Sequence, residues 1–293
     1  LRIVELFLGR FLFGSHRLLV LGDIPIFGIY EQVLFVHRLQ LIRQCHAFEL
    51  RMAILRRIFN LNKRFVCGFI VQSELMARGL EKTYRIPREK IWLVRQPPVV
   101  TPQQISNKLV CQSSSRTMRL FYPSRDYPHK NHALLWDAAY SGLLDDCVDK
   151  IVLTVVAAAC IREDDRIECI GELGTEEVAA QYYAADALVF PSLEESYGLP
   201  LVEAMAFNLP ILVADRPYAR DLCGNEAFYF DPSDVGDFAR ATQRLKVMLD
   251  QGWKPDWASQ SSKVPRDWAD AALQMDEVMQ RVSETPRSNS SGR

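Results

Sequence analysis

The chain has 293 residues, of which 48% are hydrophobic and 24% charged, and its 35 basic and 36 acidic side chains leave a formal net charge of −1. This length exceeds one ordinary core and predicts two compact domains, while the balanced charge excludes the general electrostatic footprint of a nucleic-acid-binding protein. Seven scattered cysteines without metal-type spacing predict reduced thiols in a cytoplasmic chain and no metal site.

The first part of the chain alternates short apolar runs with amphipathic stretches. Residues 1–30 carry too many charges for a membrane span and predict buried strand and helix, with a lipid-contacting surface as the alternative. Strands are predicted at residues 17–21, 32–36, 66–71 and 91–94. Helical spacing of apolar residues covers 38–58 and 73–84, and Ser73 is the expected N-cap of the second helix.

Residues 97–117 interrupt this alternation with three prolines and a polar tail, which predicts a linker. Beyond it, strands are predicted at 119–124, 150–156, 166–171, 187–192, 210–214 and 227–230, and helices at 131–141, 175–184, 200–207 and 234–250. The pattern predicts two α/β domains with doubly wound parallel sheets that face a ligand cleft. The expected boundaries are a first domain at 1–100, a linker at 101–117, a second domain at 118–265, a helix at 266–282 and a disordered tail at 283–293.

Three glutamates stand in the otherwise apolar segment "FPSLEESYGLPLVEAMAFNLPILVAD", which begins at Phe190. Glu195 follows a buried strand, and Glu203 follows the start of a helix, so both are expected at the carboxyl edge of the sheet, where open α/β folds bind ligands. Carboxylates can accept hydrogen bonds from the vicinal hydroxyls of a sugar, although they could also merely favour the helix N-terminus. Glu194 is interpreted as an ordinary loop residue.

Two cations follow an earlier strand in "LFYPSRDYPHKNHALLWDA". Arg125 and Lys130 lie between that strand and the start of a helix, a position from which they could hold a diphosphate without a metal. Two solvated loop charges are the simpler alternative for an isolated pair of this kind.

Both segments resemble the retaining family-four glycosyltransferases, which have the GT-B fold of two Rossmann-like domains. Glu195, "SYGLPLV" and Glu203 reproduce the family's Glu-x7-Glu signature, and the loop that carries Arg125 and Lys130 resembles the family's diphosphate loop. The segment "RIECIGELGTEEVAAQYYAADALVFPS" resembles the strand and helix that flank the nucleotide base. The resemblance covers roughly residues 17–250 and is strongest in the second domain.

The resemblance implies a role for each matching residue. Arg125 and Lys130 would contact the diphosphate, Glu195 the donor sugar and Glu203 the ribose hydroxyls. His37, which ends the strand "QVLFV", would face the donor sugar, so the implied catalytic residues are His37, Arg125, Lys130 and Glu195. The other implied donor-binding positions are Gly171, Leu173, Tyr197, Gly198 and Leu199. Tyr182 and Tyr183 are interpreted instead as packing residues of the 175–184 helix.

The sequence departs from the family pattern in three places, one of which is the short connection "AAACIREDD", where the family usually has a longer helical crossover. Asn208 stands where the family typically has Gly in the turn before the next strand. The family's opening strand, Gly-rich loop and helix have no counterpart before Leu1, so the first domain is expected to be truncated.

The resemblance implies a retaining glycosyltransferase that moves a hexose from a nucleotide diphosphate sugar to an acceptor hydroxyl, in polysaccharide or glycolipid synthesis. No metal or other cofactor is expected, and the pairs Asp145/Asp146 and Asp164/Asp165 are interpreted as solvated loop charges. The acceptor would be a saccharide or a lipid-linked molecule, and the dense basic residues of the first domain suggest peripheral contact with the cytoplasmic membrane face. The alternatives are a catalytically silent nucleotide-sugar-binding protein and another nucleotide-sugar enzyme, such as an epimerase or a phosphorylase-type enzyme.

Overall fold

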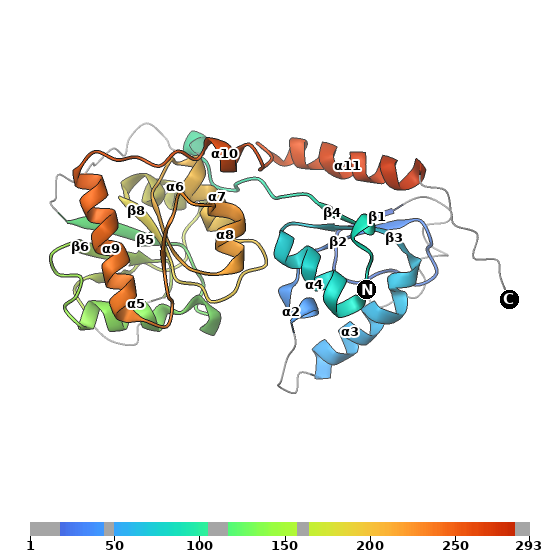
Figure 1. Cartoon of the computed structure of the whole chain (residues 1–293), viewed down its shortest axis with the longest axis horizontal. Helices are drawn as coiled ribbons and strands as arrows, with labels where there is room; N and C mark the ends of the chain where they lie inside the picture. The colour runs from blue at the N-terminus through green and yellow to red at the C-terminus, as the bar shows by residue number, and fades with distance from the viewer. Residues whose placement is uncertain (1–17, 44–49, 105–116, 157–163, 285–293) are drawn as a thin grey trace. The chain divides into compact units, whose positions relative to one another are not determined.

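The computed structural model of the chain describes residues 18–43, 50–104, 117–156 and 164–284 (Figure 1). The chain forms two compact units, of which the first comprises residues 1–96 and 265–293 and the second residues 97–264. The division at Gln96 and Pro97 lies four residues before the predicted end of the first domain, and the C-terminal helix belongs to the first unit. The predicted linker and tail fall mostly outside the described residues, as does the apolar stretch 1–17.

The first unit contains a parallel sheet whose strands follow the order of the chain. Its strands are β1 (Leu18–Val20), β2 (Gln32–Val36), β3 (Val66–Val71) and β4 (Ile91–Leu93). The helices α2 (Leu39–Ile42), α3 (Leu50–Asn62) and α4 (Glu74–Tyr84) accompany it, and α11 (Trp268–Glu284) lies on the side opposite α3 and α4 (Figure 1). Short 3-10 turns occur at η1 (Lys63–Phe65) and η2 (Arg88–Lys90).

The buried strand β2 supplies side chains to both cores of this unit, because successive residues of a strand point to opposite faces. Leu34 and Val36 pack with the helices α3 and α4. Val33 and Phe35 pack with Met275 and Val278, and both of these residues lie on α11. The sheet of the first unit therefore has both faces covered, as parallel sheets require.

The second unit has six parallel strands in the order β7-β6-β5-β8-β9-β10. They are β5 (Met118–Tyr122), β6 (Val148–Leu153), β7 (Ile167–Cys169), β8 (Ala187–Phe190), β9 (Ile211–Ala214) and β10 (Phe228–Phe230). This is the Rossmann order, in which the direction of strand addition reverses between the first and fourth strands, here β5 and β8. Ligands bind in the crevice at such a reversal, so the carboxyl ends of β5 and β8 mark the expected site.

Helices connect these strands and cover the sheet. They are α5 (His132–Tyr140), α6 (Thr175–Ala184), α7 (Leu199–Ala206), α8 (Pro217–Cys223), α9 (Val235–Asp250) and α10 (Ala258–Ser261), with 3-10 turns η3 (Pro102–Gln104) and η4 (Pro128–Lys130). Figure 1 shows α5 and α9 on one side of the sheet and α7 and α8 on the other. Right-handed crossovers require this change of side where the strand order reverses.

Most predicted elements occur within the described residues, and the differences are local. The stretch 38–58 is not one helix, because α2 ends at Ile42 and α3 begins at Leu50, with 44–49 outside the described residues. The short helix α8 was not predicted. Ser73 is the N-cap of α4 as expected, since its hydroxyl oxygen accepts a hydrogen bond from the N–H of Met76 at 3.3 Å.

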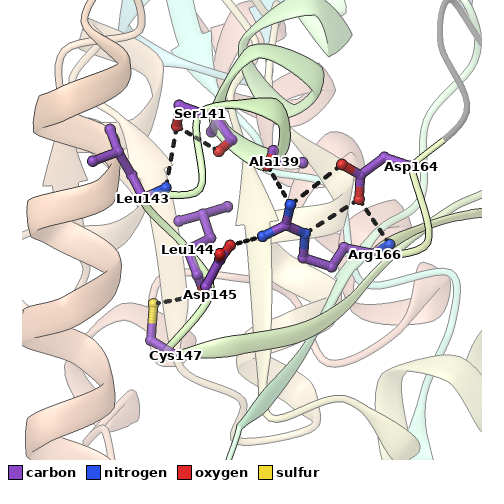
Figure 2. Close-up of polar contacts among 9 residues, drawn as sticks. Ala139, Ser141, Leu143, Leu144, Asp145, Cys147, Asp164 and Arg166 are labelled. Atoms are coloured by element: carbon purple, nitrogen blue, oxygen red, sulfur yellow. Dashed lines mark hydrogen bonds and ion pairs between the residues drawn. The ribbon is translucent and has the colours of Figure 1, made fainter.

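Arg166 corrects the interpretation of two aspartates as solvated charges (Figure 2). Its guanidinium forms an ion pair with Asp145, contacts Asp164 at 3.2 Å and donates to the carbonyl of Ala139 at 2.5 Å. The aspartates therefore tie the end of α5 and the following turn to the start of β7. The expectation of reduced thiols also needs correction, because Cys169 is disulfide-bonded, whereas Cys147 and Cys223 carry buried thiols.

Candidate functional site

A pocket of about 460 Å³ opens in the second unit where the sheet order reverses. It is lined by Pro123, Ser124, Arg125, Tyr127, Lys130, Thr154, Glu172, Leu173, Val178, Leu199, Pro200 and Glu203. These residues come from the segments after β5, β6 and β7 and from α6 and α7. Five positions implied by the resemblance are thus gathered at one site, namely Arg125, Lys130, Leu173, Leu199 and Glu203.

Lys130 and Glu195 meet beside this pocket. The Lys130 Nζ lies 2.6 Å from Glu195 Oε1, and each side chain is only 14% exposed. Water screens such a pair weakly, so the two charges are strongly coupled. A backbone bond brings their loops together, because the N–H of Leu193 donates to the carbonyl of His129 at 2.8 Å. The cation predicted after β5 and the carboxylate predicted after β8 are therefore direct partners.

Buried hydroxyls fix the backbone beneath this ion pair. The Tyr122 hydroxyl donates to the carbonyl of Lys130 at 3.0 Å and lies 2.7 Å from the Ser192 hydroxyl. Tyr218 donates to the Ser192 carbonyl at 2.6 Å. Burial raises the pKa of the Tyr122 phenol far above its usual value, so the hydroxyl stays protonated. The sequence pattern does not reveal this support, because the hydrogen-bonded partners are up to 70 residues apart.

Glu203 is a buried carboxylate at the wall of the pocket. Its side chain projects from α7, and the residue is 7% exposed. Oε2 accepts a hydrogen bond from the Tyr182 hydroxyl at 2.9 Å, and Oε1 accepts one from the N–H of Val100 at 3.3 Å. Burial raises the pKa of Glu203, while these hydrogen bonds act in the opposite direction. Tyr182 is therefore a packing residue, as predicted, and also a hydrogen-bond donor, which was not predicted.

Ser124 and His132 add a second unpredicted contact at the pocket. The Ser124 Oγ lies 2.7 Å from His132 Nε2, and burial lowers the pKa of that imidazole below its usual value. The N–H of Ser124 also donates to the Thr154 hydroxyl at 2.8 Å. The residue that precedes Arg125 is thus held from two sides.

The start of α7 requires its glycine. Gly198 has a φ of +108°, and a Cβ there would lie 3.1 Å from Leu201 Cδ1, so a side chain would strain the turn. Pro200 occupies the first turn, where its missing N–H is no loss. Unlike the five lining positions, Gly171, Glu195, Tyr197 and Gly198 are not part of the pocket lining, and the Tyr197 side chain is buried.

His37 lies in the first unit, directly after β2. Its N–H donates to Asp23 Oδ1 at 2.9 Å, and its Nδ1 lies 3.4 Å from the same oxygen. Asp23 is buried and also accepts from the N–H of Arg38 at 2.9 Å, so it fixes the backbone at the end of the strand. The sequence analysis did not single out Asp23. Within the described residues, no group of three or more His, Cys, Asp or Glu side chains is arranged to hold a metal ion.

The strand order of the second unit, with a pocket at the reversal, defines an α/β domain of the Rossmann type. Residues 117–246 match the model of the family described as glycosyl transferases group 1. The chain is 23% identical over 246 residues to the O-antigen chain mannosyltransferase RfbU of Salmonella typhimurium, a match that covers 81% of this chain and 67% of that protein. It is 33% identical over 82 residues to the serotype-specific mannosyltransferase WbdA of Escherichia coli, which is 28% of this chain and 10% of that protein.

A glycosyltransferase from Rickettsia africae is similar in structure, with a TM-score of 0.64 at 14% identity over 87% of this chain and 71% of that one. This similarity shows the shared GT-B type of α/β fold. Residues 117–246 thus resemble the glycosyl transferases group 1 family, and together with the two mannosyltransferases this similarity indicates that the chain is a glycosyltransferase. No helix among the residues that the structure describes has the length and apolar character to span a membrane.

Proposed function

We propose that the chain transfers a hexose from a nucleotide diphosphate sugar to an acceptor hydroxyl, with retention at the anomeric carbon, in the synthesis of a polysaccharide or glycolipid. The observation that carries this proposal is the 2.6 Å contact between Lys130 and Glu195 beside the pocket. This contact joins two groups that the reaction needs. Lys130 is a cation that can stabilise the leaving diphosphate, and Glu195 is a carboxylate that can accept hydrogen bonds from the transferred sugar.

The pocket supplies the groups that such a reaction needs. Breaking the bond to the sugar leaves negative charge on the diphosphate, and Arg125 and Lys130 would stabilise it as it develops. The N-terminal turn of α7, which also lines the pocket, would add the positive end of its helix dipole. No metal ion is proposed, because these groups can stabilise the negative charge that develops on the diphosphate.

The neutral part of the donor is assigned to the remaining residues. Glu203 would accept hydrogen bonds from the ribose, Leu173 would lie against the base, and Glu195 would contact the hydroxyls of the sugar. A contact of Gly171 with the base stays a prediction. The assignment of His37 to the donor sugar stays a prediction. Mannose is the first candidate for the transferred hexose, because RfbU and WbdA are both described as mannosyltransferases.

Nucleotide binding and turnover measured together test this function. We expect GDP, UDP or ADP at a hundred times its Kd to raise the melting temperature by several degrees, because such binding stabilises the fold by about 2.7 kcal/mol. The matching nucleotide sugar, incubated with acceptor saccharides, should yield an α-linked product from an α-linked donor. Binding without transfer or hydrolysis would favour the silent binding protein, whereas conversion of the sugar while it remains nucleotide-bound would favour an epimerase. If none of the nucleotides binds, the proposal is wrong.

The proposal also includes contact with an anionic membrane at its cytoplasmic face, through a basic face of α3. That helix contains no acidic residue, and its Arg51 and Arg57 are exposed, whereas Arg56 donates to the backbone carbonyl of Gln40. Lys63 and Arg64 follow the helix directly. Its exposed side carries Leu50, Ile54 and Leu61, three apolar residues spaced for one helical face. Cationic and apolar side chains on one surface suit the headgroup region of an anionic bilayer, which is where a lipid-linked acceptor would be found.

Charge reversal on this basic face is expected to weaken vesicle binding. The double variant Arg51→Glu/Arg57→Glu should bind vesicles that contain phosphatidylglycerol at least about tenfold more weakly than the unmodified chain, since each basic residue contributes about 1 kcal/mol near such a surface. Lys254→Glu/Lys263→Glu makes the same charge change at exposed positions of the second unit and is the matched control. Equal cosedimentation of both double variants with the vesicles would remove α3 from the proposal.

A further inference from the structure

Tyr182 is buried in a way that its packing role alone does not explain. Its ring is stacked on Phe207, with centroids 5.1 Å apart, and meets the ring of Phe121 edge-on at 5.1 Å. A phenylalanine would make the same ring contacts. The hydroxyl instead introduces a polar group into a fully buried position, which is costly unless the group is hydrogen-bonded. Its shortest hydrogen bond is the 2.9 Å contact with Glu203 Oε2, and a longer one reaches the Pro200 carbonyl at 3.4 Å.

Both oxygens of Glu203 are held by donors of the surrounding chain. Tyr182 donates to Oε2 and the N–H of Val100 donates to Oε1, and the backbone of Val99 forms a further hydrogen bond with the carboxylate. An ionised carboxylate has about four acceptor positions in total, two on each oxygen. These contacts therefore fix the plane of the carboxylate and leave about one acceptor position open. Because Glu203 lines the pocket, this arrangement suits a ligand with a hydroxyl group.

We infer that Tyr182 is a positioning residue for nucleotide recognition, whose hydroxyl, together with the Val100 N–H, holds Glu203 in the orientation that accepts a hydroxyl of the ribose. This inference rests on the proposed function, since it requires a nucleotide in the pocket. Tyr182 does not line the pocket and acts only through Glu203. Burial raises the pKa of the Tyr182 phenol well above its usual value, so it remains a donor at every pH at which the fold is studied.

Removal of the hydroxyl alone should therefore alter ribose recognition and leave the rest of the nucleotide site intact. In Tyr182→Phe, Oε2 of Glu203 loses its fixed donor, so the carboxylate can rotate away from the ribose. The phosphates and the base are expected to bind as before, because Arg125, Lys130 and Leu173 have no contact that depends on the Tyr182 hydroxyl. The loss should appear in the KM for the nucleotide sugar, with little change in kcat.

The experiment measures binding of GDP and UDP and of their 2′,3′-dideoxy analogues by calorimetry. The unmodified chain should prefer the ribonucleotide, and Tyr182→Phe should weaken ribonucleotide binding by about tenfold while changing dideoxynucleotide binding by less than about twofold. Tyr183→Phe removes a hydroxyl from the next residue of α6, whose side chain is 43% exposed, and should bind all four ligands normally.

Glu203→Gln separates a failure of this inference from a failure of the proposed function. If Glu203→Gln keeps the full preference for ribose, or if the unmodified chain shows none, Glu203 does not hold the ribose and the functional assignment fails. If Glu203→Gln loses the preference but Tyr182→Phe retains it, the site stands and the role of Tyr182 is refuted. An equal loss of all four ligands in Tyr182→Phe also refutes it, because a general effect on the pocket is not positioning of one carboxylate.

Discussion

Lys130→Ala is expected to lower the kcat of sugar transfer by about a hundredfold to a thousandfold, which is the usual cost of removing one preorganised group that stabilises developing charge. Lys130 lies in η4, between β5 and α5, and its side chain is largely shielded from water. A cation that is shielded from water stabilises a leaving diphosphate far better than a solvated cation does, because water screens its charge less. The measurement is the transfer rate at saturating nucleotide sugar.

The substitution also removes the partner of Glu195, so loss of stability must be separated from loss of catalysis. A largely buried carboxylate without its cation is destabilising, and Lys130→Ala alone should lower the melting temperature. The double variant Lys130→Ala/Glu195→Ala removes both charges and should recover part of that stability, yet remain inactive. Lys246→Ala, on α9, removes a lysine that is paired with Asp250 outside the pocket and is the control. Transfer by Lys130→Ala at the unmodified rate would exclude Lys130 from the reaction.

The sequence predicted the sheets well because parallel strands that are buried on both faces are continuous apolar runs. Strands such as β8 and β9 are buried throughout and read as "ALVF" and "ILVA". The sequence was less informative about which sheet each helix packs against. The amphipathic pattern of α11 predicts a helix with one apolar face, but it does not determine that the face packs against β2 and β3 of the first unit.

The predicted order of the strands was sufficient to place the pocket residues near one another. It did not predict the hydrogen bonds that hold these residues in position. Arg125 and Lys130 follow β5 and Glu195 follows β8, so adjacency of these two strands is sufficient to bring them together. The contacts of Tyr122 with Ser192, and of Tyr182 with Glu203, join residues 70 and 21 positions apart. Such pairs leave no periodic trace in one sequence, since a buried tyrosine has the same apolar spacing as a phenylalanine. Only the three-dimensional structure shows the hydrogen-bond partners of their hydroxyls.

Glu195→Gln is expected to separate the donor sugar from the donor nucleotide. We expect transfer to fall by at least about a hundredfold, because the neutral amide cannot stabilise positive charge on the sugar ring. Binding of the free nucleoside diphosphate should instead become about two- to tenfold tighter. Lys130 now shares its charge with Glu195 at 2.6 Å, and neutralising that carboxylate leaves the full cation available to the phosphates.

Opposite changes in the two measurements distinguish this role from general damage to the pocket. Misfolding or a displaced loop would weaken both nucleotide binding and transfer, whereas loss of a sugar-contacting charge next to a phosphate-binding cation weakens transfer alone. Glu194→Gln makes the same chemical change one residue earlier in the same loop and should leave both quantities within about twofold of the unmodified chain. If Glu195→Gln binds the diphosphate more weakly and Glu194→Gln does not, Glu195 supports the phosphate loop and does not contact the sugar.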